Sequence, residues 1–279
     1  MAQRGQGQAR RAANSSVVEA GARAGFVARG IIYVLVGLLA LRIAFQDGGG
    51  GGGGQQADRG GALSEISQKP FGGAVLWALG VALVGMALWR LSEAAFGVTG
   101  PDGKKATKRL ASAGRAVFYG FVSYSVLSFA AGDKDSGSGS SDKRSQDVTA
   151  RVLDLTGGKW IVGVAGAFVV GAGLWIAGRA IMRTFHKKLR MGEMSHRMRQ
   201  AVDVVGIFGG ASRGIVFAAA GGFAIAAAAK YKSGQAKGMD DTLRSFTETP
   251  AGPWLLVVIA IGLSAFGLFS FANARWRRT

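Results

Sequence analysis

The chain has no cysteine among its 279 residues and only two histidines. The lack of cysteine excludes disulfides, thiol nucleophiles and cysteine-bound metals, although it says little about the compartment. His186 and His196 lie ten residues apart, so on a helix they point in different directions. Glu193 is the only other metal ligand close to them in sequence. We therefore expect no metal site.

Acidic residues are also scarce, and none lies inside the long apolar stretches of the sequence. A proton relay built from buried carboxylates is therefore not expected. The sequence also lacks a nucleophile elbow, a P-loop, an HExxH motif and a dinucleotide-binding fingerprint. From these absences we expect a protein that is not an enzyme and that binds no cofactor.

Hydrophobic residues make up 49% of the chain and gather into six long blocks. Each block is close to the ~20 residues that a helix needs to cross a bilayer. The sequence therefore predicts an all-α membrane protein with six transmembrane helices. The blocks are Phe26–Phe45, Phe71–Leu91, Ala113–Ala131, Trp160–Met182, Ile207–Ala229 and Trp254–Ala274.

The first block follows a polar lead and has no small-residue cleavage site at its end, so it is not a cleavable signal. Two interpretations of Ser15–Arg23 stay open. This segment is either a short amphipathic helix on the membrane surface or a frayed tail.

The net charge of +18 is concentrated at the ends of the apolar blocks. Taken together, the two terminal tails and the second and fourth connections hold 18 lysines and arginines, whereas the other three connections hold 11. The positive-inside rule then places both termini in the cytoplasm. For a bacterial protein, the membrane is the cytoplasmic membrane. Membrane topology and contact with anionic lipid explain these basic residues, so we expect no nucleic acid partner.

One helical pattern occurs three times, in the first apolar block of each pair. A small residue, an arginine, an aromatic residue and a second small residue follow one another at four-residue intervals, which places them on one helix face. The arginines are separated by 86 and then 98 residues, so the chain contains an internal repeat. The arginine and aromatic positions are Arg29 with Tyr33, Arg115 with Tyr119, and Arg213 with Phe217.

The second block of each pair has its own pattern of two glycines followed by an aromatic residue. Small residues of this kind let helices approach closely in lipid, so we expect these glycines to be helix-packing positions. They are Gly80 and Gly85, Gly166 and Gly171, and Gly262 and Gly267. In the first copy Glu93 stands where the other copies have arginine, which indicates either pairing with a neighbouring arginine or drift at an exposed helix end.

The repeat divides the chain into a flexible cytoplasmic tail, 1–20, and three copies, 21–100, 101–190 and 191–279. Because each copy crosses the membrane twice, all three share one orientation, which allows a pseudo-threefold axis along the membrane normal. Gly- or Ser-rich runs at 47–54 and 135–142 are either spacers or mobile lids. We expect short amphipathic helices on the outer face at Ala62–Ile66, Val148–Leu155 and Asp241–Phe246.

The repeated arginines allow two interpretations. Around a threefold axis Arg29, Arg115 and Arg213 would form a cationic ring for phosphate, carboxylate or halide, with the aromatic residues stacked on them. Alternatively each arginine reaches the anionic headgroups and fixes the depth of its helix. Sequence alone does not say which way the stripe faces.

Several segments resemble the bacterial, often actinobacterial, membrane proteins of the domain of unknown function 1206 family. The resemblance covers nearly the whole chain beyond the first twenty residues. It implies a six-span membrane protein of three two-helix copies with no settled activity. Copy two departs from the family pattern, because Gly157–Trp160 lacks the proline found in the other copies. The matching segments are Ala28–Tyr33, Gly114–Tyr119, Ser212–Phe217, Gln68–Gly72 and Pro250–Leu255.

Two functional hypotheses follow. The first is a structural or accessory membrane protein that binds anionic lipid headgroups, or a protein partner through the cytoplasmic loops 91–112 and 183–205. The second is an anion or small-solute channel with a central ring of Arg29, Arg115 and Arg213. The first is favoured, because helices rich in glycine and alanine pack tightly. The sequence leaves the oligomeric state open.

Overall fold

The computed structural model describes residues 16–46, 56–97, 105–133, 141–230, 232, 234, 236–247 and 252–278. In this part of the chain the only strand-like pairing is an antiparallel bridge between Leu189 and Arg277. The prediction of an all-α fold is therefore confirmed for these residues. The helices are α2 (Ser16–Gln46), α3 (Arg59–Ser67), α4 (Gly72–Phe96), α5 (Ala106–Ala130), α7 (Ser141–Leu153), α8 (Gly158–Ile181), the 3-10 helices η1 (Thr184–Lys188) and η2 (Met191–Glu193), α9 (His196–Lys230), α10 (Met239–Ser245) and α11 (Gly252–Trp276).

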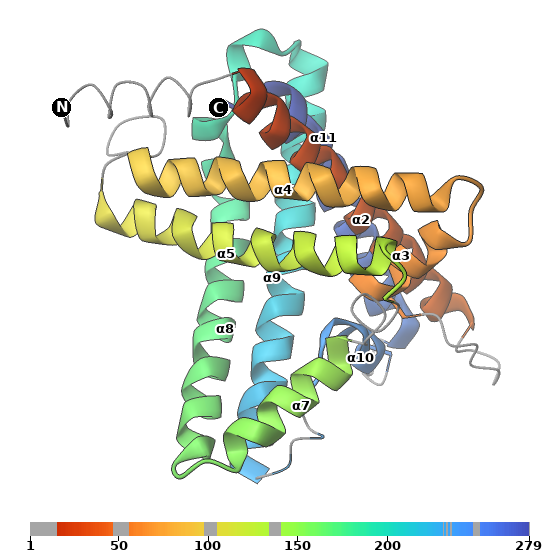
Figure 1. Ribbon diagram of the computed structural model, residues 1–279, viewed down its shortest axis with the longest axis vertical. Coiled ribbons are helices and arrows are strands. Elements are labelled where there is room, and N and C mark those ends of the chain that lie inside the picture. Colours follow the sequence, from red (N-terminus) through yellow and green to blue (C-terminus); the bar gives the residue numbers. More distant parts are fainter. Residues whose placement is uncertain are drawn as a thin grey trace.

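Six long helices form three pairs, α2 with α11, α4 with α5, and α8 with α9 (Figure 1). Each pair joins the second helix of one copy to the first helix of the next, and α11 closes the set by packing on α2. Figure 1 shows that α4 and α5 run across α8 and α9. The pairs are therefore tilted against one another and do not form a single parallel bundle.

The three copies are not equivalent in their internal contacts. In the first copy α2 packs against α4, and in the third α9 packs against α11. Within the described part of the second copy, α5 and α8 make almost no contact. Large apolar side chains on both helices consequently stay exposed, among them Phe121 on α5 and Phe168 on α8.

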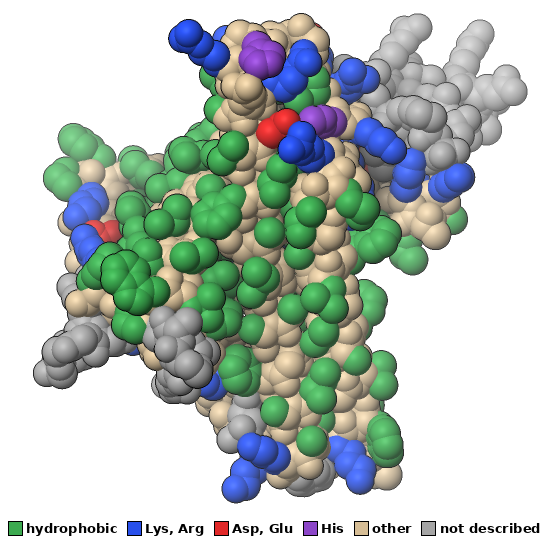
Figure 2. Space-filling model, turned by 180° about the vertical axis from the view of Figure 1, so that it is seen from behind, with side chains coloured by type: hydrophobic (Ala, Val, Ile, Leu, Met, Phe, Trp, Pro, Cys, Tyr) green, Lys and Arg blue, Asp and Glu red, His purple; other side chains and the backbone are tan. Residues whose placement is uncertain are grey.

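Among the described helices, five are long and apolar enough to cross a membrane. α5 is 25 residues long, but its first ten residues include Lys108, Arg109 and Arg115, which lower its hydropathy. Figure 2 shows hydrophobic side chains over much of this face, with lysines and arginines at both ends of the long axis and also on the projections at either side. The five apolar helices fit a multi-pass membrane protein. The five spans are Val18–Phe45, Gly72–Phe96, Gly158–Ile181, His196–Lys230 and Pro253–Trp276.

The amino-terminal end of α2 differs from both sequence expectations. Residues 16–23 are the first turns of the same helix that carries the first span, so they form neither a separate surface helix nor a frayed tail. Packing explains the difference. Ala22 and Phe26 are fully buried, and a Cβ atom on Gly21 would lie 3.0 Å from the Cα atom of Gly85 on α4.

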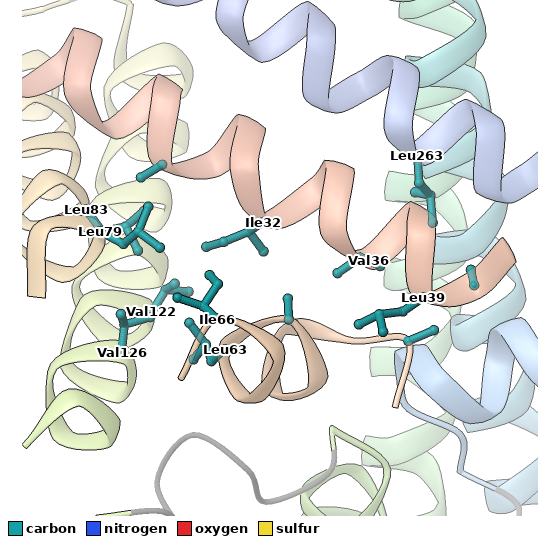
Figure 3. Packing of buried hydrophobic residues seen from close by; sticks show 14 of the residues in the cluster. Ile32, Val36, Leu39, Leu63, Ile66, Leu79, Leu83, Val122, Val126 and Leu263 are labelled. Atoms are coloured by element: carbon teal, nitrogen blue, oxygen red, sulfur yellow. The ribbon is translucent and has the colours of Figure 1, made fainter. Parts of the chain in front are cut away.

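Short helices occur in all three connections where the sequence predicts them, but α3 and α10 pack more deeply than expected. Asp58 caps α3, because its Oδ1 atom accepts a hydrogen bond from the backbone N–H of Gly61 at 2.9 Å. Leu63 and Ile66 of α3 then lie among side chains of α2, α4 and α5 (Figure 3). In α10 Leu243 is likewise buried. These two helices are therefore part of the core and do not lie on an outer face.

The helix of the second connection, α7, is more exposed. Leu153 is buried against the bundle, whereas Val148 is 61% exposed. Leu155, which was expected on the apolar face of this helix, lies beyond its end and is also exposed. The Gly-rich run 47–54 and residues 135–140 lie outside the described residues.

Five of the six marked glycines lie at close helix contacts. Gly80 lies against Leu127 of α5, and Gly262 lies against Ser212 of α9. A Cβ atom added to Gly85, Gly166 or Gly267 would lie within 3 Å of a backbone atom on a neighbouring helix. That atom belongs to Gly21 for Gly85, to Gly221 for Gly166 and to Gly30 for Gly267. Gly171 is the exception, because a Cβ atom there would meet nothing within 4 Å. The expected packing role of Gly171 is wrong for this chain, since the opposite face of α8 meets α9.

Candidate functional site

A cavity of about 300 Å³ lies where the first helices of the three copies meet. Two arginines and two tyrosines of the long helices line it, together with Asp58 and Arg59 at the start of α3 and Met239 of α10. The rest of the wall is mainly apolar. The lining residues are Arg29, Ile32, Tyr33 and Val36 of α2, Asp58, Arg59 and Gly60, Leu83 of α4, Phe118, Tyr119, Phe121 and Val122 of α5, Arg213 and Phe217 of α9, and Met239.

Arg29 is fixed by contacts from three helices. Its Nε atom donates a hydrogen bond to Oγ of Ser270 on α11 at 3.0 Å, and its Nη1 atom donates to Oη of Tyr119 on α5 at 3.2 Å. Its guanidinium carbon lies 4.9 Å from the ring centre of Phe26 and 5.1 Å from that of Phe266. Such cation–π contacts are stronger where water is excluded. Arg29 is therefore held at the cavity wall by aromatic rings and neutral hydroxyls.

Arg213 approaches the same cavity from α9. Its guanidinium carbon lies 4.9 Å from the ring centre of Phe266, 5.1 Å from Phe217 and 5.7 Å from Tyr33. Its Nε atom is buried and has no hydrogen-bond partner among the described residues. A buried donor without an acceptor costs about 1–3 kcal/mol, more for a charged group. Arg213 thus has one buried donor that finds no acceptor among the described residues.

Phe266 connects the two arginines, since both guanidinium groups lie about 5 Å from its ring centre. Tyr33 packs edge-to-face on the same ring at 4.8 Å. Among the described residues, no carboxylate forms a salt bridge with Arg29 or Arg213. Two like charges near one aromatic ring and one cavity favour an anion between them.

The structure brings together five of the six residues predicted for the arginine site, namely Arg29, Arg213, Tyr33, Tyr119 and Phe217. Arg115 does not join them. Its side chain is exposed, it is absent from the cavity lining, and its charge interacts with Arg90 and Glu93 of α4.

The expected ring of three arginines is therefore incomplete. α5 packs along α4 and not against α8, so it does not occupy the place that α2 and α9 occupy in their copies. Instead α5 presents Tyr119 to the cavity, where its hydroxyl contacts Arg29.

Sequence reasoning missed Phe266, Ser270 and the start of α3. Phe266 and Ser270 lie on α11, and the matching positions of α4 and α8 do not repeat these residue types. The repeat therefore contained no signal for them. Asp58 and Arg59 lie shortly after the Gly-rich run and reach the cavity only because α3 folds inward.

Comparison with known proteins identifies relatives without an assigned activity. The chain is 27% identical over 251 residues to the uncharacterized protein YxxB of Bacillus subtilis (strain 168), an alignment that covers 89% of this chain and 87% of the relative. No solved structure matches the chain. The model of the family described as Domain of Unknown Function matches three successive segments, residues 24–97, 110–183 and 208–277. These matches confirm the resemblance and the threefold repeat, and the protein belongs to the Domain of Unknown Function (DUF1206) family.

Proposed function

We propose that the protein is a non-enzymatic membrane protein that binds the phosphate group of an anionic lipid in the cavity between α2, α5 and α9. The observation that supports this most strongly is the shared placement of Arg29 and Arg213. Both guanidinium groups reach one cavity and contact one ring, Phe266, without a carboxylate partner among the described residues. Arg213 also keeps a buried Nε–H without an acceptor.

The chemistry of the cavity favours a lipid over a small polar solute. Guanidinium groups match the geometry of phosphate oxygens and can donate two hydrogen bonds at once. Most of the remaining wall is apolar, with Ile32, Val36 and Phe121 among the lining residues. A phosphate at the arginines with the first carbons of an acyl chain along this wall would use both parts of the cavity.

The channel hypothesis receives less support. A conducting path would have to continue past the start of α3 and past α10. Leu63 of α3 and Leu243 of α10 are fully buried in the bundle, so both helices are packed elements. Arg115 also lies outside the lining, so the three repeated arginines do not surround one path.

We further propose six spans arranged as three parallel copies, 21–100, 101–190 and 191–279, behind a cytoplasmic tail at 1–20. The circular order of the helix pairs supports a pseudo-threefold arrangement, because each second helix packs on the first helix of the next copy. α5 supplies the sixth span in this proposal, since it packs along α4, which is itself apolar enough to span. The charge pattern supports the bacterial cytoplasmic membrane with both termini inside.

Because the chain lacks cysteine, single cysteines can report this topology without background labelling. Lys105→Cys and Ser195→Cys should react only from the cytoplasmic side, and Ser67→Cys and Asp133→Cys only from the outside. If positions 105 and 133 were labelled from the same side, α5 would not cross the membrane. The cytoplasmic loops 91–112 and 183–205 stay candidates for a protein partner.

Lipid binding is tested by native mass spectrometry of protein purified in mild detergent and supplied with phosphatidylglycerol. The wild type should retain the lipid, and the double variant Arg29→Gln/Arg213→Gln should lose it. Arg42→Gln/Arg151→Gln is the matched control, because it removes the same charge from exposed positions on other surfaces. Equal retention by all three proteins would show that the cavity holds no lipid phosphate. If inorganic phosphate replaced the lipid at the same arginines, the ligand would be the free anion.

A further inference from the structure

A second cationic cluster lies at the end of the molecule that carries the carboxyl terminus. Its centre is Arg277, which follows the last residue of α11 and reaches between α2 and α4. The guanidinium carbon of Arg277 lies 5.0 Å from the ring centre of Phe26 and 4.9 Å from that of Trp89. Arg90 lies on the same Trp89 ring, at 4.1 Å. Both guanidinium groups thus lie within 5 Å of the centre of one ring, Trp89.

The backbone fixes Arg277 in this place. The N–H of Arg190 donates to the carbonyl of Trp276 at 2.8 Å, and the N–H of Arg278 donates to the carbonyl of Lys188 at 3.0 Å. This antiparallel pairing fastens the connection between α8 and α9 to the end of α11. It also places Leu189 opposite Arg277, and the charge of Arg277 acts on the neighbouring Lys188.

Charge within the cluster is poorly balanced. Glu93 is the one carboxylate, and it is committed to Arg90 at 2.7 Å and to the hydroxyl of Ser112 at 3.1 Å. Lys188 feels the charges of Arg277, Arg115, Arg179 and Arg90. Among the described residues, the charges of four arginines therefore act on Lys188, and Glu93 is already paired with one of them, Arg90. Burying like charges without counterions is costly, so the cluster favours an added anion.

Two guanidinium nitrogens of the cluster are buried and have no hydrogen-bond acceptor among the described residues. Arg90 is only 5% exposed, and its Nε atom has no hydrogen-bond partner among the described residues. The Nε atom of Arg277 is also buried without a partner in this part of the chain. Its Nη1 atom donates to the neutral side-chain oxygen of Asn273 at 3.3 Å, so the guanidinium charge itself is not compensated.

We propose that this inner cluster is a second anion site, in which Arg277, Arg90 and Lys188 bind a phosphate group. Its cations differ from those of the cavity, although Arg29 and Arg277 both contact the ring of Phe26. The phosphate is either free inorganic phosphate or the phosphate of a lipid headgroup, because guanidinium and ammonium groups recognise both in the same way.

The pKa of Lys188 gives the site a dependence on pH. Burial, and next to it the charge of Arg277, lowers this pKa to about 7. The charged groups around Lys188 are Arg277 at the end of α11, Arg115 of α5, Arg179 of α8, and Arg90 with Glu93 of α4. Asp203 of α9 is paired with His186 and with Arg183. Because the protonated lysine binds the anion, affinity should fall as pH rises through about 7.

The test uses the whole protein in nanodiscs of neutral phosphatidylcholine, titrated calorimetrically with inorganic phosphate at pH 6.5. Lys188→Met and Arg277→Gln should each weaken binding at least tenfold. Lys187→Met is the matched control, since it removes the same charge from an exposed neighbour on η1, and it should leave binding unchanged. The double variant Arg29→Gln/Arg213→Gln should also bind phosphate normally, which separates this site from the cavity.

Two further binding measurements identify the source of the anion and test how its affinity depends on pH. If phosphate does not bind but phosphatidylglycerol binds to wild type and not to Lys188→Met, the ligand is a headgroup and the site stands. Sulfate keeps its charge between pH 6 and 8.5. The affinity of the wild type for sulfate should therefore fall as pH rises, whereas the affinity of Lys188→Met should not change. Absence of any anion binding, or equal binding by Lys188→Met and Lys187→Met, would overturn the proposal.

Discussion

Arg29 and Tyr119 occupy different positions of the repeated pattern in two different copies, and Nη1 of Arg29 donates a hydrogen bond to Oη of Tyr119 at 3.2 Å. This contact couples the first helices of copies one and two across the cavity. It also explains why the cavity does not need Arg115. A phenol takes the place on α5 where a threefold ring would require a third guanidinium group.

Removing the phenol oxygen should weaken this coupling. Tyr119→Phe keeps the ring and deletes the acceptor for a charged donor, so we expect a loss of about 1.5–3 kcal/mol in the free energy of unfolding. Thermal unfolding followed by the fluorescence of the native tryptophans measures this. Tyr124→Phe on the same helix is the control, because Tyr124 is 68% exposed. Equal effects of the two changes would mean that the hydrogen bond to Arg29 contributes nothing.

Replacing glycines of the second helices by alanine should destabilise the protein at some positions and not at others. In Gly85→Ala the new Cβ atom would meet the Cα atom of Gly21 at 2.7 Å, so α2 and α4 must move apart, at a cost of about 1–3 kcal/mol. In Gly171→Ala the Cβ atom meets nothing within 4 Å, and alanine stabilises a helix interior by up to about 1 kcal/mol. Unfolding in a denaturing detergent series would rank the two variants. A Gly171→Ala variant as unstable as Gly85→Ala would contradict this packing of α8.

The buried pair of Arg90 and Glu93 offers a third test. Glu93→Gln leaves Arg90 charged in a site where it is only 5% exposed, and breaking a buried pair in this way costs about 3–5 kcal/mol. Replacing both partners by Arg90→Met/Glu93→Leu should cost less than Glu93→Gln alone, because no unpaired charge is left. A double variant less stable than Glu93→Gln would show that the ion pair itself, which lies within α4, stabilises the fold.

Lys188 predicts a dependence of stability on pH. Its pKa in the folded protein is lowered to about 7, whereas an unfolded lysine has a pKa of about 10.4. Between these values the unfolded chain holds a proton at this position that the folded chain lacks, so the free energy of unfolding rises with pH. Below pH ~7 both states are protonated, and the full cost of the buried charge is present.

The variant Lys188→Met should therefore be more stable than wild type at pH 7, and its stability should change less between pH 7 and 9. Unfolding curves at several pH values measure this difference. Lys187→Met should follow the wild-type curve, because Lys187 is exposed. A wild-type slope that persists in Lys188→Met would assign the dependence to another group.

Much of the fold could be predicted from the sequence, because helix periodicity and apolar length act locally. The repeated arginine stripe identified Arg29, Arg213 and Tyr119 as residues of one site. The position of Arg115 could not be predicted, since it depends on how α5 packs between copies. Repeat patterns also gave no signal for Phe266, which contacts Arg29 and Arg213 from α11. The inward packing of α3 likewise depends on tertiary contacts of Leu63 and Ile66.

The most direct test of lipid binding is an experimental structure of the protein crystallised from a lipid mesophase containing phosphatidylglycerol. The expected result is a tetrahedral density in the cavity, within hydrogen-bond distance of the guanidinium groups of Arg29 and Arg213. Its acyl density should run along Ile32 and Val36. A cavity that holds only water, with the two arginines turned to headgroups at the membrane surface, would contradict the proposed function.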